Sequence, residues 1–126
     1  MADRISAPHL SLRIRFGGQD MLGPGKAEIL ERIAASGSIA AAARDMGMSY
    51  KRAWGLIETL NAMFDVPLVV SARGGPGKGG AALTDRGRAV LEAYREVEAA
   101  ARASADTPLA RLQSWLGAAS GGQNGD

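Results

Sequence analysis

The chain has 126 residues with no cysteine and one histidine, and its 15 lysines and arginines nearly balance 13 aspartates and glutamates. Without thiols, clustered carboxylates or a second histidine it offers no metal site and few groups for catalysis, so we expect neither a cofactor nor enzymatic activity. It also lacks an apolar run of about 20 residues and a signal-peptide core, so we expect a cytoplasmic protein that does not contact membranes.

The length and the 46% hydrophobic content fit one domain, which we place at residues 1–105, followed by a short helix and a disordered tail in residues 106–126. The first predicted element is a strand over His9–Phe16. It has the period-two pattern of a half-buried strand, with apolar residues at Leu10, Leu12, Ile14 and Phe16. A loop rich in glycine follows over residues 17–25.

Apolar residues at helical spacing predict three helices after this loop. The first covers Lys26–Ser36 and ends at Gly37, and the second covers Ile39–Met46. The third begins after Ser49, a preferred N-cap residue, and runs to about Phe64. The turn between the second and third helices is short and contains a glycine, which is typical of a helix-turn-helix.

A β-hairpin is predicted after the third helix. Leu68–Ser71 and Ala81–Leu83 have strand composition, and the glycine-rich segment between them carries Arg73 and Lys78. We interpret this hairpin as a wing. The predicted fold is therefore mostly α with a small β-hairpin (α+β), a winged helix-turn-helix.

A long fourth helix is predicted from a cap at Thr84 to about Ala103, and a short last helix begins near Pro108. The fourth helix has more apolar surface than so small a domain can cover by itself. We therefore expect it to mediate dimerisation through the residues of its apolar side: Val90, Leu91, Tyr94 and Val97.

The start of the third helix is the candidate site for a polyanion. Helix N-termini offer free backbone N–H groups, so Ser49 and the first turn could hold a phosphate. We expect Arg52 and then Tyr50 to contact base edges, and Lys51 to contact the DNA backbone. The alternative is an exposed helix start that contacts nothing. We expect Trp54 to pack within the protein rather than to stack on DNA.

Other basic residues extend this candidate interface. Arg73 and Lys78 in the wing suit phosphate or minor-groove contacts, although a merely flexible hairpin tip is the alternative. Arg44, at the end of the second helix, could equally contact a phosphate or water. The pattern G-x-G-x-x-G within residues 75–80 lacks the βαβ context of a nucleotide-binding loop, so we do not interpret it as one.

Four segments together resemble a known family: Gly37–Gly47, Ser49–Trp54, Gly74–Gly80 and Leu83–Gly87. They resemble the N-terminal DNA-binding domain of the ModE-type molybdate-responsive regulators and, more distantly, the LysR-type winged helix. The resemblance implies a dimeric repressor or activator, paired through the first strand region and the fourth helix, with the third helix in the major groove. Molybdate-binding domains follow in that family, whereas only about twenty residues follow the fourth helix here, so we expect no molybdate sensing.

The function expected from these features is sequence-specific binding of double-stranded DNA by a homodimer at an inverted-repeat operator. The alternative is a winged-helix module that binds a protein partner through its long apolar helix and Leu109–Leu116. Such a module has no need for basic residues at both Ser49–Arg52 and the wing, which favours the DNA-binding hypothesis.

Overall fold

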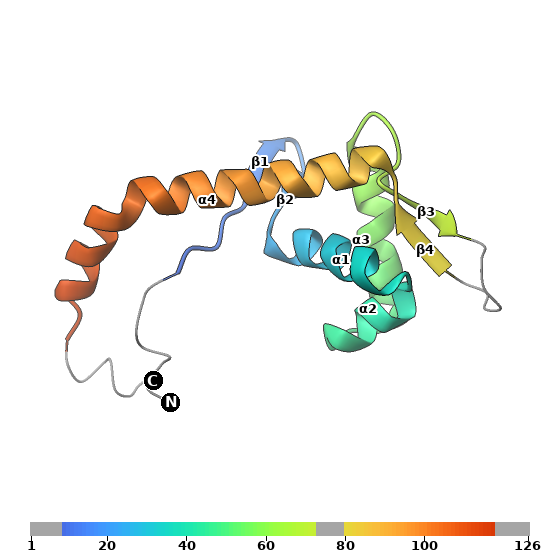
Figure 1. Cartoon of the computed structure of the whole chain (residues 1–126), viewed down its shortest axis with the longest axis horizontal. Coiled ribbons are helices and arrows are strands. Elements are labelled where there is room, and N and C mark those ends of the chain that lie inside the picture. Colours follow the sequence, from blue (N-terminus) through green and yellow to red (C-terminus); the bar gives the residue numbers. More distant parts are fainter. Residues whose placement is uncertain (1–8, 73–79, 118–126) are drawn as a thin grey trace. The chain divides into compact units, whose positions relative to one another are not determined.

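A computed structural model describes residues 9–72 and 80–117 of the chain (Figure 1). Two compact units make up the chain. One is Leu12–Arg95, and the other combines Met1–Ser11 with Glu96–Asp126. The first unit contains the first three helices and all strands of the described residues, so it holds the elements of the predicted winged helix-turn-helix.

The N-terminal strand is shorter than predicted and has an unexpected partner. Strand β1 covers Ile14–Gly17 and pairs in antiparallel fashion with β2, Asp20–Leu22, which the sequence analysis assigned to a loop. Gly17 and Gly18 turn the chain between them with φ of 130° and 55°, a region that favours glycine. Residues 9–13 have no strand partner among the described residues, which explains why the ladder begins only at Ile14.

The alternation that predicted this strand is only partly preserved. Leu12 and Ile14 are half-buried and Arg13 is exposed, as a half-buried strand requires. Phe16, expected on the inner side, is instead 55% exposed. Its ring contacts Phe64 edge to face at a centroid distance of 6.3 Å, so it packs at the rim of the unit rather than in the core.

The three helices of the helix-turn-helix region confirm the prediction closely. Helix α1 is Pro24–Ser36, α2 is Ile39–Asp45 and α3 is Tyr50–Met63. Pro24 occupies the first position of α1, where a missing N–H costs nothing. The hydroxyl of Ser49 caps α3.

The inner sides of these helices form one core with the wing and the start of α4. Small residues in α2 allow α1 and α3 to approach it closely. The largest fully buried side chains come from α1, α3, the start of the wing and α4: Ile29, Leu30, Ile33, Ile57, Leu60, Leu68 and Tyr94.

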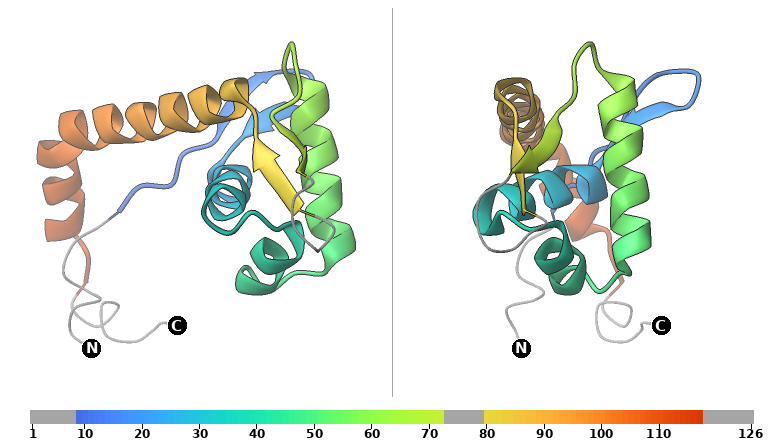
Figure 2. Two further views of the ribbon diagram at one scale, coloured as in Figure 1. Left: turned by 45° about the vertical axis from the view of Figure 1, so that its right-hand side comes forward. Right: turned by 90° about the vertical axis from the view of Figure 1, so that its right-hand side faces the viewer.

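Two strands form the base of the wing, β3 (Val69–Ala72) and β4 (Gly80–Leu83), with Val69 opposite Leu83. The ribbon of this hairpin can be followed in Figure 2. The Asn61 side chain joins the hairpin to α3. Its Oδ1 accepts hydrogen bonds from the backbone N–H groups of Leu68 and Val69 at 2.8 and 3.1 Å, and its Nδ2 donates to the Val69 carbonyl at 3.1 Å.

The wing is also tied to α1 and to the start of α4. The Ala81 N–H donates to the carbonyl of Gly37 at 3.0 Å. The Thr84 hydroxyl accepts the Gly87 N–H and donates to the Pro67 carbonyl. A Cβ at Gly87 would lie 2.2 Å from the Leu68 carbonyl oxygen, so only glycine fits this crossing.

Helix α4 covers Asp85–Ser114 and includes Pro108. The predictions of an end near Ala103 and of a separate last helix are therefore wrong. A proline removes one backbone donor and crowds the preceding turn, which bends a helix without ending it, and the ribbon of α4 bends in its last part (Figure 1). No helix within residues 9–72 and 80–117 is long and apolar enough to span a membrane.

We expect Asn61→Ala to lower the free energy of unfolding by about 2 kcal/mol, because it leaves three backbone groups at the wing without their partner. Chemical denaturation measures this difference. Thr59→Ala is the matched control, because that exposed hydroxyl bonds only within α3 and its loss should change stability by less than about 0.5 kcal/mol. Equal losses in the two variants would contradict the role given to Asn61.

Candidate nucleic-acid interface

Helix α3 presents a continuous outer stripe. Its inner stripe, Ala53, Ile57 and Leu60, is buried in the core. The opposite stripe at helical spacing is exposed throughout and consists of Lys51, Gly55, Glu58 and Ala62. Because the inner stripe anchors the helix, the outer stripe is free to meet a partner.

The first turn of α3 has both an internal cap and unused donors. Ser49 Oγ accepts the backbone N–H of Arg52 at 3.0 Å, so the predicted N-cap is confirmed. The backbone N–H groups of Tyr50 and Lys51 have no acceptor within the described part of the chain. These two groups stand at the positive end of the helix dipole, where an anion is favoured.

The three predicted contact residues of this turn are exposed, but they do not share one face. Lys51 lies on the outer stripe. Tyr50, 52% exposed, lies toward the wing, and by helical spacing Arg52 lies on the other flank. The structure therefore places the lysine, not the arginine, at the centre of the presented surface.

An aromatic groove separates α3 from the wing, and the sequence analysis did not foresee it. It is lined by Tyr50 and Trp54 from α3 and by Val70, Ser71 and Gly80 from the strands. Trp54 is 42% exposed, so the expectation that it packs within the protein holds only in part. The i, i+4 spacing of two aromatic residues beside a predicted wing was the available signal.

Among the other basic residues, several are paired within the protein. Arg86 binds Asp65 through two contacts of 2.5 and 2.7 Å, and Arg88 binds Asp85 at 2.5 Å. These two arginines, which follow the wing, are therefore already neutralised by carboxylates of the protein. Arg73 and Lys78 fall in residues 73–79, which lie outside the described residues.

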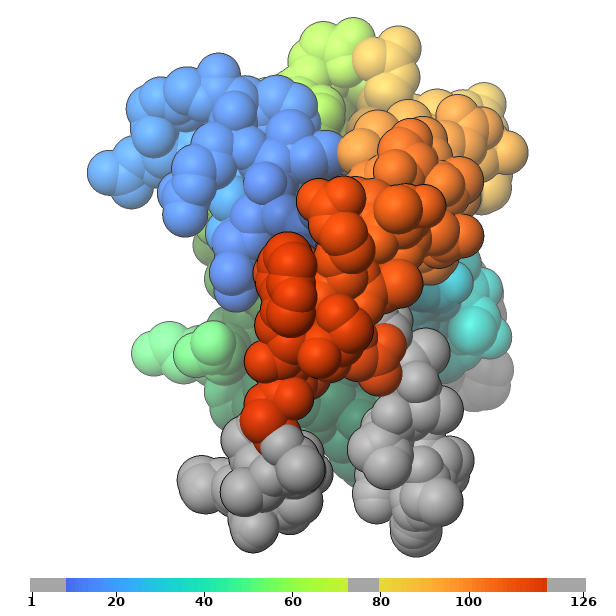
Figure 3. Space-filling view, turned by 90° about the vertical axis from the view of Figure 1, so that its left-hand side faces the viewer, coloured from blue at the N-terminus to red at the C-terminus, as the bar shows by residue number. Residues whose placement is uncertain are grey.

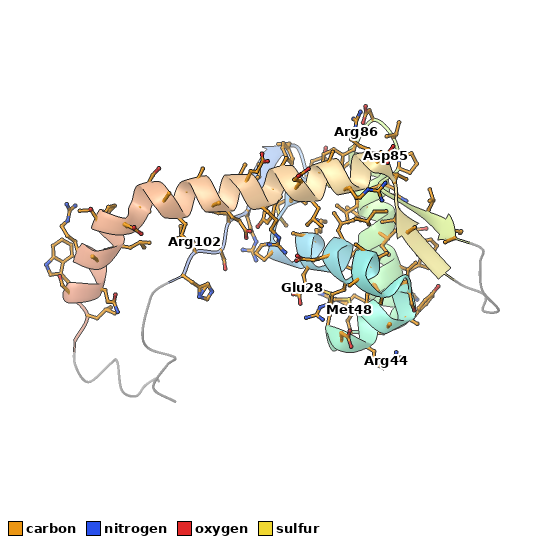
Figure 4. All side chains as sticks on the ribbon, viewed as in Figure 1. Glu28, Arg44, Met48, Asp85, Arg86 and Arg102 are labelled. Atoms are coloured by element: carbon orange, nitrogen blue, oxygen red, sulfur yellow. The ribbon has the colours of Figure 1, made fainter. Side chains whose placement is uncertain are left out.

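Arg44 differs from these paired arginines. It is exposed in the last turn of α2 and extends from the edge of that helix (Figure 4). It has no ion-pair partner in the described parts of the chain, whereas its neighbour Asp45 pairs with Arg32 at 3.7 Å. Its guanidinium is thus available to an external anion.

The proposed dimer contacts are divided between core and surface. Tyr94 is 1% exposed and its hydroxyl donates to the Leu12 carbonyl at 2.7 Å, so it serves the core of its own unit. Val90 and Leu91 also pack against this core, because the first half of α4 covers it. Of the four residues, only Val97 is exposed enough to contact a second copy of the chain, since 44% of its surface is accessible.

The second unit exposes further apolar side chains along the C-terminal part of α4, whose surface is orange to red in Figure 3. Leu112 is 58% exposed, Trp115, just beyond the helix, is 70% exposed and Leu116 is 65% exposed. Within the described residues no three acidic, histidine or cysteine side chains come together as a metal site.

Known proteins resemble both the sequence and the fold. The molybdenum-pterin-binding protein MopA of Rhodobacter capsulatus is 40% identical over 90 residues, covering 71% of this chain and 34% of MopA. The molybdenum transport protein ModE of Azotobacter vinelandii is 39% identical over 96 residues, covering 76% of this chain and 36% of that protein. The chain thus spans about a third of the length of these relatives.

Two further similarities concern proteins whose names refer to DNA. The DNA-binding transcriptional dual regulator ModE of Escherichia coli K12 is 44% identical over 71 residues, which are 56% of this chain and 27% of that regulator. The crystal structure of the CbnR DBD–DNA complex matches with a TM-score of 0.54 and 26% identity, covering 70% of this chain and 95% of the CbnR chain.

A family model also matches residues 25–88, half of the chain. The match includes α1, α2, α3, the wing and the first turn of α4, which are the elements that build the surface described above. The chain belongs to the lysR family of bacterial regulatory helix-turn-helix proteins.

Proposed function

We propose that this chain is a transcriptional regulator that binds double-stranded DNA as a homodimer, with α3 in the major groove. The observation that carries the proposal is the start of α3, where two backbone N–H groups with no acceptor among the described residues stand beside exposed Tyr50, Lys51 and Arg52. The structural similarity to the CbnR DBD–DNA complex, which covers 95% of the CbnR chain, supports DNA binding.

The exposed side chains suggest a division of contacts. Lys51 is central on the outer stripe, so we assign it to base edges rather than to the backbone as first expected. Arg52 keeps its assignment from the flank, because its planar fork matches the two acceptors of guanine. Arg44, Arg73 and Lys78 are assigned to phosphates.

Dimerisation is proposed through exposed apolar residues of α4 and of the segment just beyond it. Val97, Leu112 and Trp115 expose apolar surface that a second copy of the helix would remove from water. A two-fold dimer presents two α3 helices, so the operator should be an inverted repeat. The alternative is a protein partner on this same surface, with no contact to DNA.

The names of the relatives refer to molybdenum, and this property is not carried over. The matched stretch in those proteins is about a third of their length. The residues described in this chain form the helix-turn-helix, the base of the wing and α4. We therefore propose DNA binding, and not molybdate binding, for the residues described here.

Selection of bound duplexes from a random pool should recover an inverted repeat. Because each subunit has three cations assigned to phosphates, a dimer makes about six such contacts, and the logarithm of affinity should fall with the logarithm of salt concentration with a slope of about −5. Fluorescence anisotropy at several salt concentrations measures this slope. Failure to enrich any duplex at low salt would favour the protein-partner alternative.

Replacement of Arg52 and Lys78 by alanine should have different effects. Arg52→Ala should lower the affinity for the selected duplex by about tenfold and the affinity for random DNA much less, because base contacts are sequence-dependent. Lys78→Ala should lower the affinity for both duplexes by the same factor. Arg102→Ala, an exposed arginine on the C-terminal half of α4 (Figure 4), is the control and should change neither affinity. If Arg52→Ala and Lys78→Ala give the same pattern, the division of contacts is wrong.

A further inference from the structure

Gly55 is the unexplained residue of α3. It is the sixth residue of a 14-residue helix and is exposed. Glycine in a helix interior is less stable than alanine, because it gives up more backbone freedom on folding. A glycine at this position therefore requires an explanation from the fold or from the function.

Packing within the chain provides none. A Cβ built at Gly55 would meet no atom within 4 Å, and the backbone has no positive φ there. The helical glycine in α4 shows the contrast, because a Cβ at Gly87 would collide with the Leu68 carbonyl. Gly87 is explained by the fold, whereas Gly55 is not.

The residues around Gly55 suggest a functional explanation for the glycine. It sits on the outer stripe between Lys51 and Glu58, next to the partly exposed Trp54. The missing side chain leaves a notch in the middle of the face that the proposed function turns toward DNA. Glu58 bears on the kind of contact, since a carboxylate is repelled by phosphates but accepts a hydrogen bond from the amino group of cytosine.

We propose that Gly55 is the point where α3 approaches the base-pair edges of the major groove most closely, and that its lack of a Cβ determines how deeply the helix enters. This inference rests on the proposed function. It makes Gly55 a specificity-determining residue, because the depth of entry decides whether Lys51 and Glu58 reach the bases.

Two substitutions of increasing size test the proposal on a duplex selected by the wild-type chain. Gly55→Ala should raise the folding equilibrium constant by about fivefold, because alanine has the higher helix propensity. It should nevertheless lower the affinity for the duplex by about tenfold, which is the effect of one mismatched base pair. Gly55→Leu should weaken binding further. Gly25→Ala is the matched control, because Gly25 is also exposed in a helix with open space at its Cβ and should leave affinity unchanged.

Each other outcome overturns the proposal. Unchanged affinity in Gly55→Ala would exclude close approach while leaving DNA binding intact. Equal losses for alanine and leucine would indicate that backbone flexibility matters instead, at the turn where the Thr59 hydroxyl donates to the Gly55 carbonyl at 3.0 Å. A wild-type chain that selects no duplex would overturn both this inference and the proposed function.

Discussion

The arrangement of the interface depends on the side-chain amide of Asn61. It satisfies three backbone groups where the chain enters the wing, and it does so from the C-terminal half of the helix whose N-terminal turn carries Tyr50, Lys51 and Arg52. A buried or half-buried backbone group without a partner is costly, so the hairpin is held in one position relative to α3. The aromatic groove between Trp54 and Val70 exists because this spacing is fixed.

The other contacts of α3 bury its inner stripe and leave its outer stripe exposed. The buried stripe through Ile57 holds the helix in the core, and Ser49 satisfies one of its first backbone donors. Acidic side chains neutralise Arg86 and Arg88 at the start of α4, but none pairs with Arg44 within the described residues. The start of α3 therefore combines exposed Lys51 and Arg52 with two backbone N–H groups that have no acceptor in the described part of the chain, as an anion-binding surface requires.

Local signals were sufficient to predict the helix-turn-helix. The cap at Ser49, Gly37 and the apolar spacing placed α1, α2 and α3 nearly at their observed ends, because these signals act within a few residues. Features that depend on tertiary partners were missed. Strand β2 has only three residues and is recognisable only by its pairing, and α4 continues through Pro108 because a proline can bend a helix as well as end it.

The candidate site shows the same limit. The sequence identified exposed residues at the start of α3, but it did not show that Tyr50 and Trp54 line a groove with the wing, because that depends on tertiary packing. An apolar side on α4 does not reveal what covers it, so Tyr94 was assigned to a dimer although it belongs to the core. Gly55 was overlooked because only the structure shows that a Cβ at this position would meet no atom within 4 Å.

The most direct test is titration of the selected duplex into isotopically labelled protein, with the backbone amide signals followed by NMR. If α3 enters the groove as proposed, the largest shifts fall on the free N–H groups of Tyr50 and Lys51 and on Gly55. Shifts confined to the C-terminal half of α4, with the start of α3 unchanged, would contradict the proposal that this helix contacts DNA.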